Sequence, residues 1–185
     1  MLNLFNNKAM NKLLVSILAL IIISYSNINA QKTNDNSKTT SHLLTQDNPA
    51  FSISFPDEYN LEESSNDNGL KTEFYRSVSG DNVYMFKYTQ HKNPAVSSDN
   101  EVYMLASVES FVNGIEGTLI NKEKIKYKKS NGMDAFLTID DKNLNVFYRV
   151  LIINRVQYQL IVITKAEEKT SGIKNFFNSF NSLVK

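Results

Sequence analysis

The stretch LNVFYRVLII, residues 144–153, decides the fold because it is apolar on both sides of an extended strand. Side chains of a strand alternate between the two faces of a sheet. Both alternating sets are apolar here, with Val146, Tyr148 and Val150 on one face and Phe147, Leu151 and Ile153 on the other. A strand that buries both faces lies in the middle of a sheet, between two covering layers. The stretch therefore predicts the centre of a layered α+β domain.

Three neighbouring runs extend this strand into a meander. They contain β-branched and aromatic residues and lie at residues 125–127, 133–139 and 156–164. Turn-forming residues separate the runs at 131–132, 140–143 and 154–155. Strands joined by such short turns most simply pair antiparallel, each with the next in sequence.

The first half of the chain predicts three more strands. Residues 51–55 alternate between apolar side chains and serines, which indicates a half-buried strand, and the proline that follows ends it. Residues 70–78 and 83–89 are aromatic-rich runs joined by a short glycine-containing turn, and they predict a hairpin. The polar residues 62–69, which precede this hairpin, are predicted to be a loop.

In two segments the spacing of the apolar residues is that of a helix and not that of a strand. In the first, apolar residues recur every three or four positions, at Met104, Leu105, Val108, Phe111, Val112 and Ile115. In the second they do so at Ile173, Phe176, Phe177 and Phe180, a stripe that must dock on a core. The order of three strands, a helix, four strands and a helix predicts one twisted, mainly antiparallel sheet of about seven strands covered by helices, an α/β/α sandwich.

Three short pieces of the chain resemble the PsbP-like superfamily. They are FSISFP at residues 51–56, YRVLII leading through a turn to YQL at residues 148–160, and FFNSF at residues 176–180. The superfamily includes an extrinsic photosystem protein, a Ran-binding nuclear import factor and many bacterial exported proteins. The resemblance implies an α/β/α sandwich and a bias toward binding or assembly roles, and it implies no reaction.

The N-terminus has the pattern of a secretory signal. Lys8 and Lys12 precede an apolar run at residues 13–23, and no acid occurs in this segment. The run is shorter than the roughly 20 apolar residues that span a bilayer, which favours cleavage. Cleavage after Ala30 is predicted, and the alternatives are cleavage after Ser26 or retention as a membrane anchor. The chain is therefore expected to be exported to a bacterial periplasm or secreted.

Three regions follow from these features, a signal peptide at 1–30, a flexible polar tether at 31–48 and a PsbP-like α+β domain at 49–185. The tether is predicted because its polar residues bury too little surface to offset the entropy lost on ordering.

The chain has no cysteine, which excludes a disulfide framework and a lipid-modified cysteine. Removing the signal takes away two lysines and no acid, so the formal net charge changes from +1 to −1. This balance gives no reason to expect a nucleic-acid partner.

No group of residues forms a recognisable catalytic, cofactor or metal site. His42 and His91 are predicted to lie in the tether and in a loop, without a ligand cluster or a nucleophile motif beside them. The segment SSNDNG at 64–69 resembles a calcium loop but lacks the carboxylates of its first and last ligand positions. The acid pairs at 140–141 and 167–168 are interpreted as a turn and the approach to a helix. The sequence therefore predicts no cofactor.

One charge feature is patterned, a row of lysines on a predicted strand, Lys122, Lys124, Lys126 and Lys128, which would share one face. The row is interpreted first as a solvated or lysine-protected edge strand. The second interpretation is a partner surface for an anionic group, such as a lipid headgroup or an acidic protein. Tyr84, Phe86 and Tyr88 also share a strand face and are interpreted as core packing rather than an open ligand platform.

These observations predict a non-catalytic, exported module that binds or supports a component of the cell envelope. The alternative is an envelope hydrolase whose carboxylates or hydroxyls are distant in sequence and meet only in the fold. A membrane is expected as a partner only if the signal is retained or the lysine row binds headgroups. A deep pocket with converging polar groups would favour the enzyme, and a shallow apolar patch would favour binding.

Overall fold

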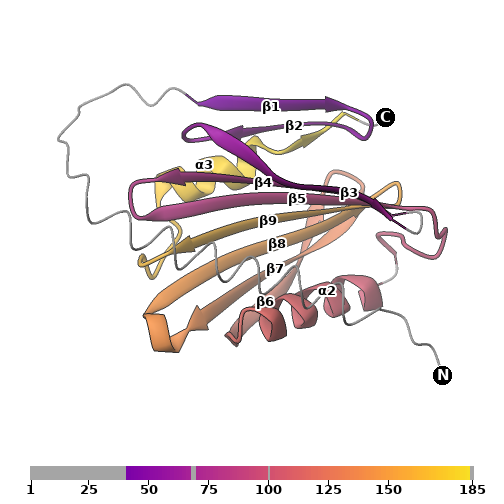
Figure 1. Cartoon of the computed structure of the whole chain (residues 1–185). Coiled ribbons are helices and arrows are strands. Elements are labelled where there is room, and N and C mark those ends of the chain that lie inside the picture. Colours follow the sequence, from indigo (N-terminus) through magenta and orange to yellow (C-terminus); the bar gives the residue numbers. More distant parts are fainter. Residues whose placement is uncertain (1–40, 68–69, 100, 184–185) are drawn as a thin grey trace.

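A computed structural model describes residues 41–67, 70–99 and 101–183. The predicted signal peptide and most of the predicted tether lie outside these residues. Within them, two antiparallel sheets and two α-helices form the fold (Figure 1). No helix of the described part of the chain is long and apolar enough to cross a membrane.

The larger sheet has seven strands in one antiparallel series. Their order across the sheet is β3 (Tyr59–Asp67), β4 (Leu70–Ser79), β5 (Asn82–His91), β9 (Val156–Thr164), β8 (Leu144–Ile153), β7 (Ser130–Ile139) and β6 (Thr118–Tyr127). A single 3-10 turn, η1 (Asp140–Lys142), connects β7 to β8. The predicted hairpin and the predicted meander are both present, because β4 pairs with β5 and each strand from β6 to β9 pairs with the next.

A separate three-stranded sheet corrects two predictions. It consists of β1 (His42–Asp47), β2 (Ala50–Phe55) and β10 (Asn181–Ser182), in the order β1-β2-β10. The strand predicted at 51–55 is therefore not part of the large sheet. The predicted tether is also too long, because its residues 42–47 pair along their whole length with β2. The ordered domain begins before residue 49 because Leu44 is buried. Leu44 pairs with Ile53 of β2, and both side chains belong to the same core.

Strand β3 is a third correction, because the polar loop predicted at 62–69 is largely an edge strand. Residues Tyr59–Asp67 pair with β4, with a register shift between Leu61 and Glu63. An edge strand of this kind buries few side chains, so its sequence lacks the apolar alternation that marks a half-buried strand. Backbone hydrogen bonds to β4, and not side-chain burial, hold this strand in place.

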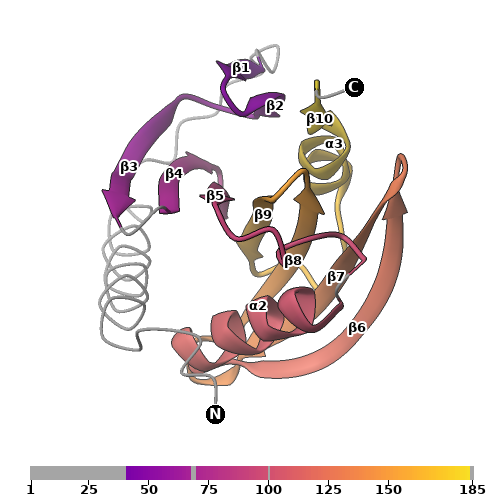
Figure 2. The same cartoon turned by 90° about the vertical axis from the view of Figure 1, so that its right-hand side faces the viewer.

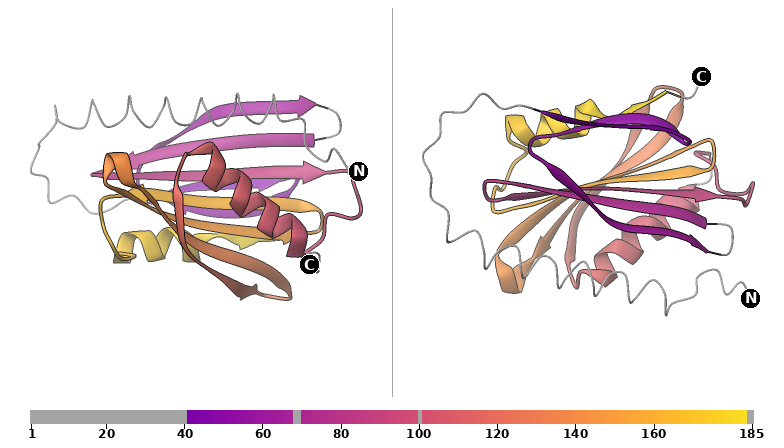
Figure 3. Two further views of the ribbon diagram at one scale, coloured as in Figure 1. Left: turned by 90° about the horizontal axis from the view of Figure 1, so that it is seen from below. Right: turned by 45° about the horizontal axis from the view of Figure 1, so that its top comes forward.

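The large sheet separates two covering layers. Helix α2 (Glu101–Gly114) crosses the face formed by β7 and β8, where the ring of Phe111 stacks on Tyr148 with 4.7 Å between centroids (Figure 3). Helix α3 (Ser171–Ser179) and the small sheet cover the opposite face (Figure 2). The second layer is thus part helix and part sheet, where the α/β/α prediction expected helices alone.

The prediction of a central strand with two buried faces is confirmed. Val146, Tyr148 and Val150 of β8 belong to the core beneath α2. Phe147, Leu151 and Ile153 of the same strand belong to the core beneath α3 and the small sheet.

The core on the α3 side is built from interlocking aromatic rings. Phe180 lies 4.9 Å from Tyr158 and Phe176 lies 5.4 Å from Phe55, measured between ring centroids. The predicted apolar stripe of the last helix is confirmed as core, since its four members are all buried: Ile173, Phe176, Phe177 and Phe180. The interpretation of Tyr84, Phe86 and Tyr88 as core packing is also confirmed, because all three are buried on this side.

Gly132 has a packing role and not the turn role that its sequence predicted. The turn between β6 and β7 lies at Lys128 and Lys129, and Gly132 sits inside β7 directly opposite Leu151. A Cβ atom at this position would lie 2.4 Å from Leu151 Cδ2 and 3.0 Å from the carbonyl oxygen of Val150. The glycine therefore allows β7 to approach β8 beneath the side chain of Leu151.

We expect Gly132→Ala to lower stability by about 1–3 kcal/mol, the usual cost of overpacking a filled core. Chemical denaturation followed by tyrosine fluorescence or circular dichroism measures the change. Gly80→Ala is a useful contrast, because a Cβ there meets nothing within 4 Å and only its left-handed φ of 55° opposes the change. An unchanged free energy of unfolding for Gly132→Ala would contradict the packing role.

Candidate functional site

The predicted lysine row lies on β6, which is an edge strand of the large sheet. Lys122 and Lys124 are opposite Ala135 and Met133, two residues of the core beneath α2, so these lysines point to the α2 side. Lys124 Nζ forms an ion pair with Glu101 Oε2 of α2 at 2.7 Å. Lys126 donates a hydrogen bond to Asn131 Oδ1.

Lys128 does not share this face, which corrects the prediction of four aligned cations. Strand β6 ends at Tyr127, and Lys128 adopts the left-handed conformation with φ of 53°. Its Nζ donates to Asn181 Oδ1 at 2.8 Å and to the carbonyl oxygen of Ser182 at 2.6 Å. Lys128 therefore ties the β6–β7 turn to β10 on the α3 side of the sheet.

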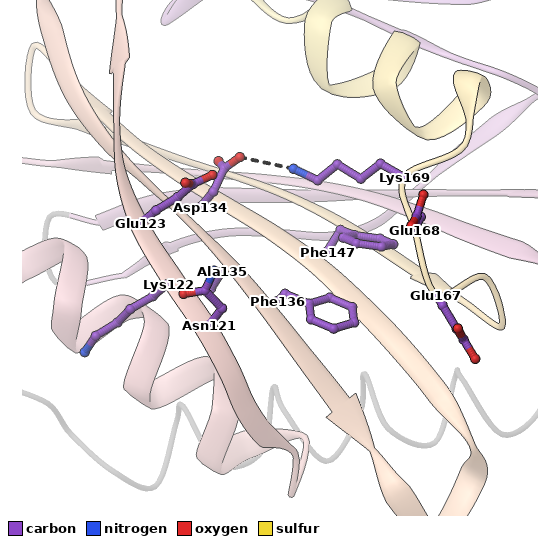
Figure 4. A pocket seen from close by; sticks show the side chains of 10 residues that line it. All are labelled: Asn121, Lys122, Glu123, Asp134, Ala135, Phe136, Phe147, Glu167, Glu168 and Lys169. Atoms are coloured by element: carbon purple, nitrogen blue, oxygen red, sulfur yellow. Dashed lines mark hydrogen bonds and ion pairs between the residues drawn. The ribbon is translucent and has the colours of Figure 1, made fainter.

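A pocket of about 290 Å³ lies on the α3 side of strands β6, β7 and β8, beneath the segment that leads from β9 to α3 (Figure 4). It is open to solvent on one side. Its lining comes from three separate parts of the chain: Asn121, Lys122 and Glu123, then Asp134, Ala135, Phe136 and Phe147, and finally Glu167, Glu168 and Lys169.

Asp134 forms one wall of the pocket and is held by two cations. Arg149 donates from Nε to Oδ1 at 2.6 Å and from Nη2 to Oδ2 at 2.8 Å. Lys169 Nζ lies 3.2 Å from Oδ2. Burial alone would raise the pKa of Asp134, but hydrogen bonds and charge from Arg149 and Lys169 outweigh it and hold the pKa below its usual value. Asp134 is therefore a fixed anion.

The register of the sheet brings this cluster together. Asp134 of β7 is directly opposite Arg149 of β8, so the two side chains share the α3 face. Phe177 of α3 covers both cations, with Arg149 Cζ 5.2 Å and Lys169 Nζ 4.9 Å from its ring centroid. Cations over an aromatic face gain electrostatic stabilisation from the ring. The ion cluster thus anchors the start of α3 to the sheet.

Two phenylalanines form the apolar floor of the pocket. Phe136 and Phe147 are also cross-strand partners, and their rings stack with centroids 5.1 Å apart. Phe147 is buried, while Phe136 is only half-buried and leaves part of its ring accessible. Lys169 Nζ already lies 5.8 Å from the ring centroid of Phe147, so the aromatic surface that remains for a bound group is the accessible part of Phe136.

Three glutamates surround this floor. Glu123 comes from β6 opposite Asp134, and Glu167 and Glu168 come from the segment before α3. All three are exposed, and none forms an ion pair with another described residue. An aromatic floor beneath unpaired carboxylates suits a cation carried on an apolar stem.

Sequence reasoning missed this site. The acid pair at 167–168 has the sequence context of a helix approach, and no motif marks Phe136 or Phe147 as part of a site. Only the cross-strand register, which no local pattern encodes, places Glu123 beside Asp134 and Phe136 beside Phe147. In the residues that the structure describes, no group of three or more His, Cys, Asp or Glu side chains could hold a metal ion.

Comparison with known proteins identifies the fold. No family model matches the chain, and no curated protein sequence matches it significantly. The solution structure of cyanobacterial PsbP (CyanoP) from Synechocystis sp. PCC 6803 matches 83% of this chain and 99% of that one, with a TM-score of 0.53. The chain has a PsbP-like fold. At 9% sequence identity, this likeness shows the fold alone.

A second pocket, of about 360 Å³, lies where α2 begins. Its cations are already engaged, because Lys124 pairs with Glu101 and Lys126 donates to Asn131. Asn131 in turn donates from Nδ2 to the carbonyl oxygen of Ser98 at 3.1 Å. These contacts fix the start of α2 against β6 and β7 and leave less free binding capacity than the pocket floored by phenylalanines.

The two histidines of the chain lie in strands and not in the predicted tether and loop. His42 begins β1, and His91 ends β5. His91 Nε2 lies 3.4 Å from Gln157 Oε1, and burial lowers the pKa of His91. Its partner is an amide and not a nucleophile, so this geometry does not assemble a general base with a serine.

Proposed function

We propose that this chain is an exported, non-catalytic binding or assembly module of the cell envelope, and that its pocket receives a positively charged side chain of a partner protein. The observation that carries the proposal is the aromatic floor of Phe136 and Phe147 beneath three carboxylates that have no ion pair among the described residues. The PsbP-like fold is consistent with a binding role but does not determine it.

A lysine or arginine side chain has the chemistry that this pocket complements. Its methylene stem can pack on the accessible ring of Phe136, while its charged end lies among Glu123, Glu167 and Glu168. A cation over an aromatic ring gains about 0.5–1 kcal/mol at an exposed site. The pocket volume is at the lower limit for small-molecule sites, which favours one side chain over an enclosed substrate. Binding through this pocket alone is therefore weak, and a partner would add contacts around it.

Nuclear magnetic resonance tests the pocket with defined probes. We expect the peptide acetyl-Gly-Phe-Lys-Phe-Gly-amide to shift amide resonances of β6, β7 and the segment before α3, and the same peptide with Glu in place of Lys to shift none. The triple variant Glu123→Gln, Glu167→Gln, Glu168→Gln should weaken binding of the lysine peptide at least tenfold, because three attractive charges are lost.

A matched control removes three exposed acids elsewhere, with Glu109→Gln, Glu116→Gln and Asp141→Asn. This control has the same net charge as the pocket variant and should bind the lysine peptide as the wild type does. Equal weakening in both variants would mean that overall charge, and not the pocket, attracts the peptide. Resonance shifts scattered over the molecule would likewise contradict the proposal.

The hydrolase alternative has one observation in its favour, since the pocket gathers four carboxylates from distant segments. The pKa of Asp134 is held low by Arg149 and Lys169, so Asp134 is unsuited to donate a proton at neutral pH. An enzyme would have to use the exposed glutamates instead. Turnover of any substrate in a broad hydrolase screen, abolished by Glu123→Gln, Glu167→Gln or Glu168→Gln without loss of folding, would support it.

Export is proposed on the signal pattern of residues 1–30. We expect mass spectrometry of protein recovered from the culture medium or periplasm to show a mature chain that begins at Gln31. A chain that begins at Asn27 would mean the alternative cleavage site, and recovery of Met1 in the membrane fraction would mean a retained anchor.

A further inference from the structure

The large sheet has two edge strands, and their charges are opposite. Strands β3 and β6 lie at the two ends of the strand order and have no second strand partner among the described residues (Figure 2). The edge at residues 57–67 has five acids and no base: Asp57, Glu58, Glu62, Glu63 and Asp67. The edge at residues 118–129 has five lysines and one acid: Lys122, Lys124, Lys126, Lys128 and Lys129, with Glu123.

Only some of the charged side chains on these two edges form ion pairs within the molecule. On the acidic edge, Arg76 Nε lies 2.8 Å from Glu62 Oε1. On the basic edge, Lys124 pairs with Glu101. The structure gives no ion pair with a described residue for Glu58 and Asp67 on one edge, or for Lys122 and Lys126 on the other.

Each edge also exposes one large apolar side chain. Leu61 of β3 is 53% exposed and Ile120 of β6 is 55% exposed. Both lie at an irregularity in the pairing of their strand, between Leu61 and Glu63 and between Leu119 and Asn121. Each edge thus combines unpaired backbone groups, one sign of charge and an exposed aliphatic group.

We propose that the protein associates with further copies of itself head-to-tail, with the acidic β3 edge of one copy against the basic β6 edge of the next. Two β3 edges would repel each other, as would two β6 edges, so the same charges that block like pairs favour the unlike pair. An interface between two different surfaces does not close on itself by a two-fold axis. The association therefore builds open chains, or rings of more than two copies where the rotation between copies closes, and does not stop at dimers. The anionic partner predicted for the lysine row is, on this proposal, the β3 edge of a neighbouring copy.

Sedimentation velocity of the mature chain tests the proposal. We expect the weight-average mass at low salt to rise with protein concentration beyond that of a dimer, and to fall to that of a monomer at high salt, because salt screens exposed charges. A monomer at every concentration in both buffers would overturn the proposal and leave the lysines as a protective edge. A plateau at the mass of a dimer would also overturn it.

Charge reversal gives the more specific result. Variant A carries Lys122→Glu and Lys126→Glu, so its β6 edge has three lysines and three acids and loses its net positive charge. Variant B carries Glu58→Lys and Asp67→Lys, so its β3 edge has three acids and two lysines and loses most of its net negative charge. We expect each variant alone to lose self-association at least tenfold, and an equal mixture of the two to form A–B pairs, with the unchanged β3 edge of A against the unchanged β6 edge of B.

The control variant Lys165→Glu, Lys174→Glu has the charge of variant A, but its changes lie at exposed positions outside β3 and β6, one directly after the central strand β9 and one on α3. It should associate as the wild type does, and thermal melting should show that all variants fold. A mixture of A and B that stays monomeric, or a control that also loses association, would overturn the proposal. Neither outcome bears on the peptide pocket, because pocket binding is measured separately by resonance shifts.

Discussion

Truncation of the chain after Gly172 is expected to leave a protein that does not fold. The truncation removes every buried side chain of α3 and the strand β10, and these close the aromatic core on one face of the sheet. Loss of one packed phenylalanine costs roughly 3–5 kcal/mol. Three are lost here together, against a typical domain stability of about 5–15 kcal/mol. Circular dichroism should show no cooperative thermal transition.

A single substitution tests the same point in a chain that still folds. Phe176→Ala should lower the free energy of unfolding by roughly 3–5 kcal/mol, because Phe176 contacts Phe55 and Tyr84 and is 2% exposed. Asn175→Ala is the matched control, since Asn175 is the exposed neighbour on the same helix. Equal stability of the two variants would show that α3 is an appendage and not part of the core.

Loss of the Asp134 carboxylate is expected to have the second large effect. Asp134→Ala leaves Arg149 and Lys169 without their anion, with side chains that are only 18% and 30% exposed. Removing one partner of a buried ion pair typically costs about 3–5 kcal/mol, and the partial exposure of the two cations places this case at the lower end. Urea denaturation at neutral pH measures the loss.

The pH dependence of this loss has a definite sign. The pKa of Asp134 is lower in the folded protein than in the unfolded chain, so its stabilisation is present above the unfolded pKa of about 4 and is lost as the pH falls through the folded pKa. The difference between wild type and Asp134→Ala should therefore be largest at neutral pH and shrink in acid. A difference that stays constant into acid would mean that lost packing, and not charge, causes the effect.

Two further variants separate the effect of leaving a buried charge unpaired from the effect of losing side-chain packing. Asp134→Leu with Arg149→Met replaces the more buried pair by apolar groups and should recover much of the stability, because only the more exposed Lys169 charge is left without its anion. Glu101→Ala breaks the Lys124 pair, whose side chains are 41% and 69% exposed, and should cost no more than about 1 kcal/mol. Failure of the double variant to recover would mean that the cluster is needed to position α3.

The sequence predicted the parts of the fold that bury side chains. Residues 144–153 are apolar on both faces, and this pattern alone located the central strand and implied two covering layers. The stripes of α2 and α3 were found because their period is helical. In each case the signal is the spacing of apolar residues, which burial requires.

The elements that sequence missed are held by backbone pairing. Most of β3 was predicted as a loop and β1 as part of a tether, because polar edge strands carry no apolar alternation. Strand β10 has only two residues, too few for any periodicity. The pocket was missed for a related reason, since strand register places Glu123 and Arg149 beside Asp134 from 11 and 15 positions away, and Lys169 reaches it from 35 positions away.

The small sheet pairs the last described strand of the domain with one of its first, so the N-terminal strands are fully packed only after the C-terminal residues are in place. Ser54 of β2 donates its backbone N–H to Ser179 Oγ at 3.0 Å, and this hydroxyl donates back to the carbonyl oxygen of Ser54, across 125 positions of sequence. Contacts so distant in sequence form late, since the intervening chain must be made and ordered first. During synthesis, Phe51 and Phe55 therefore emerge from the ribosome long before the rings that bury them exist. A nascent chain of this kind stays open to a chaperone until its final turn of helix has been made.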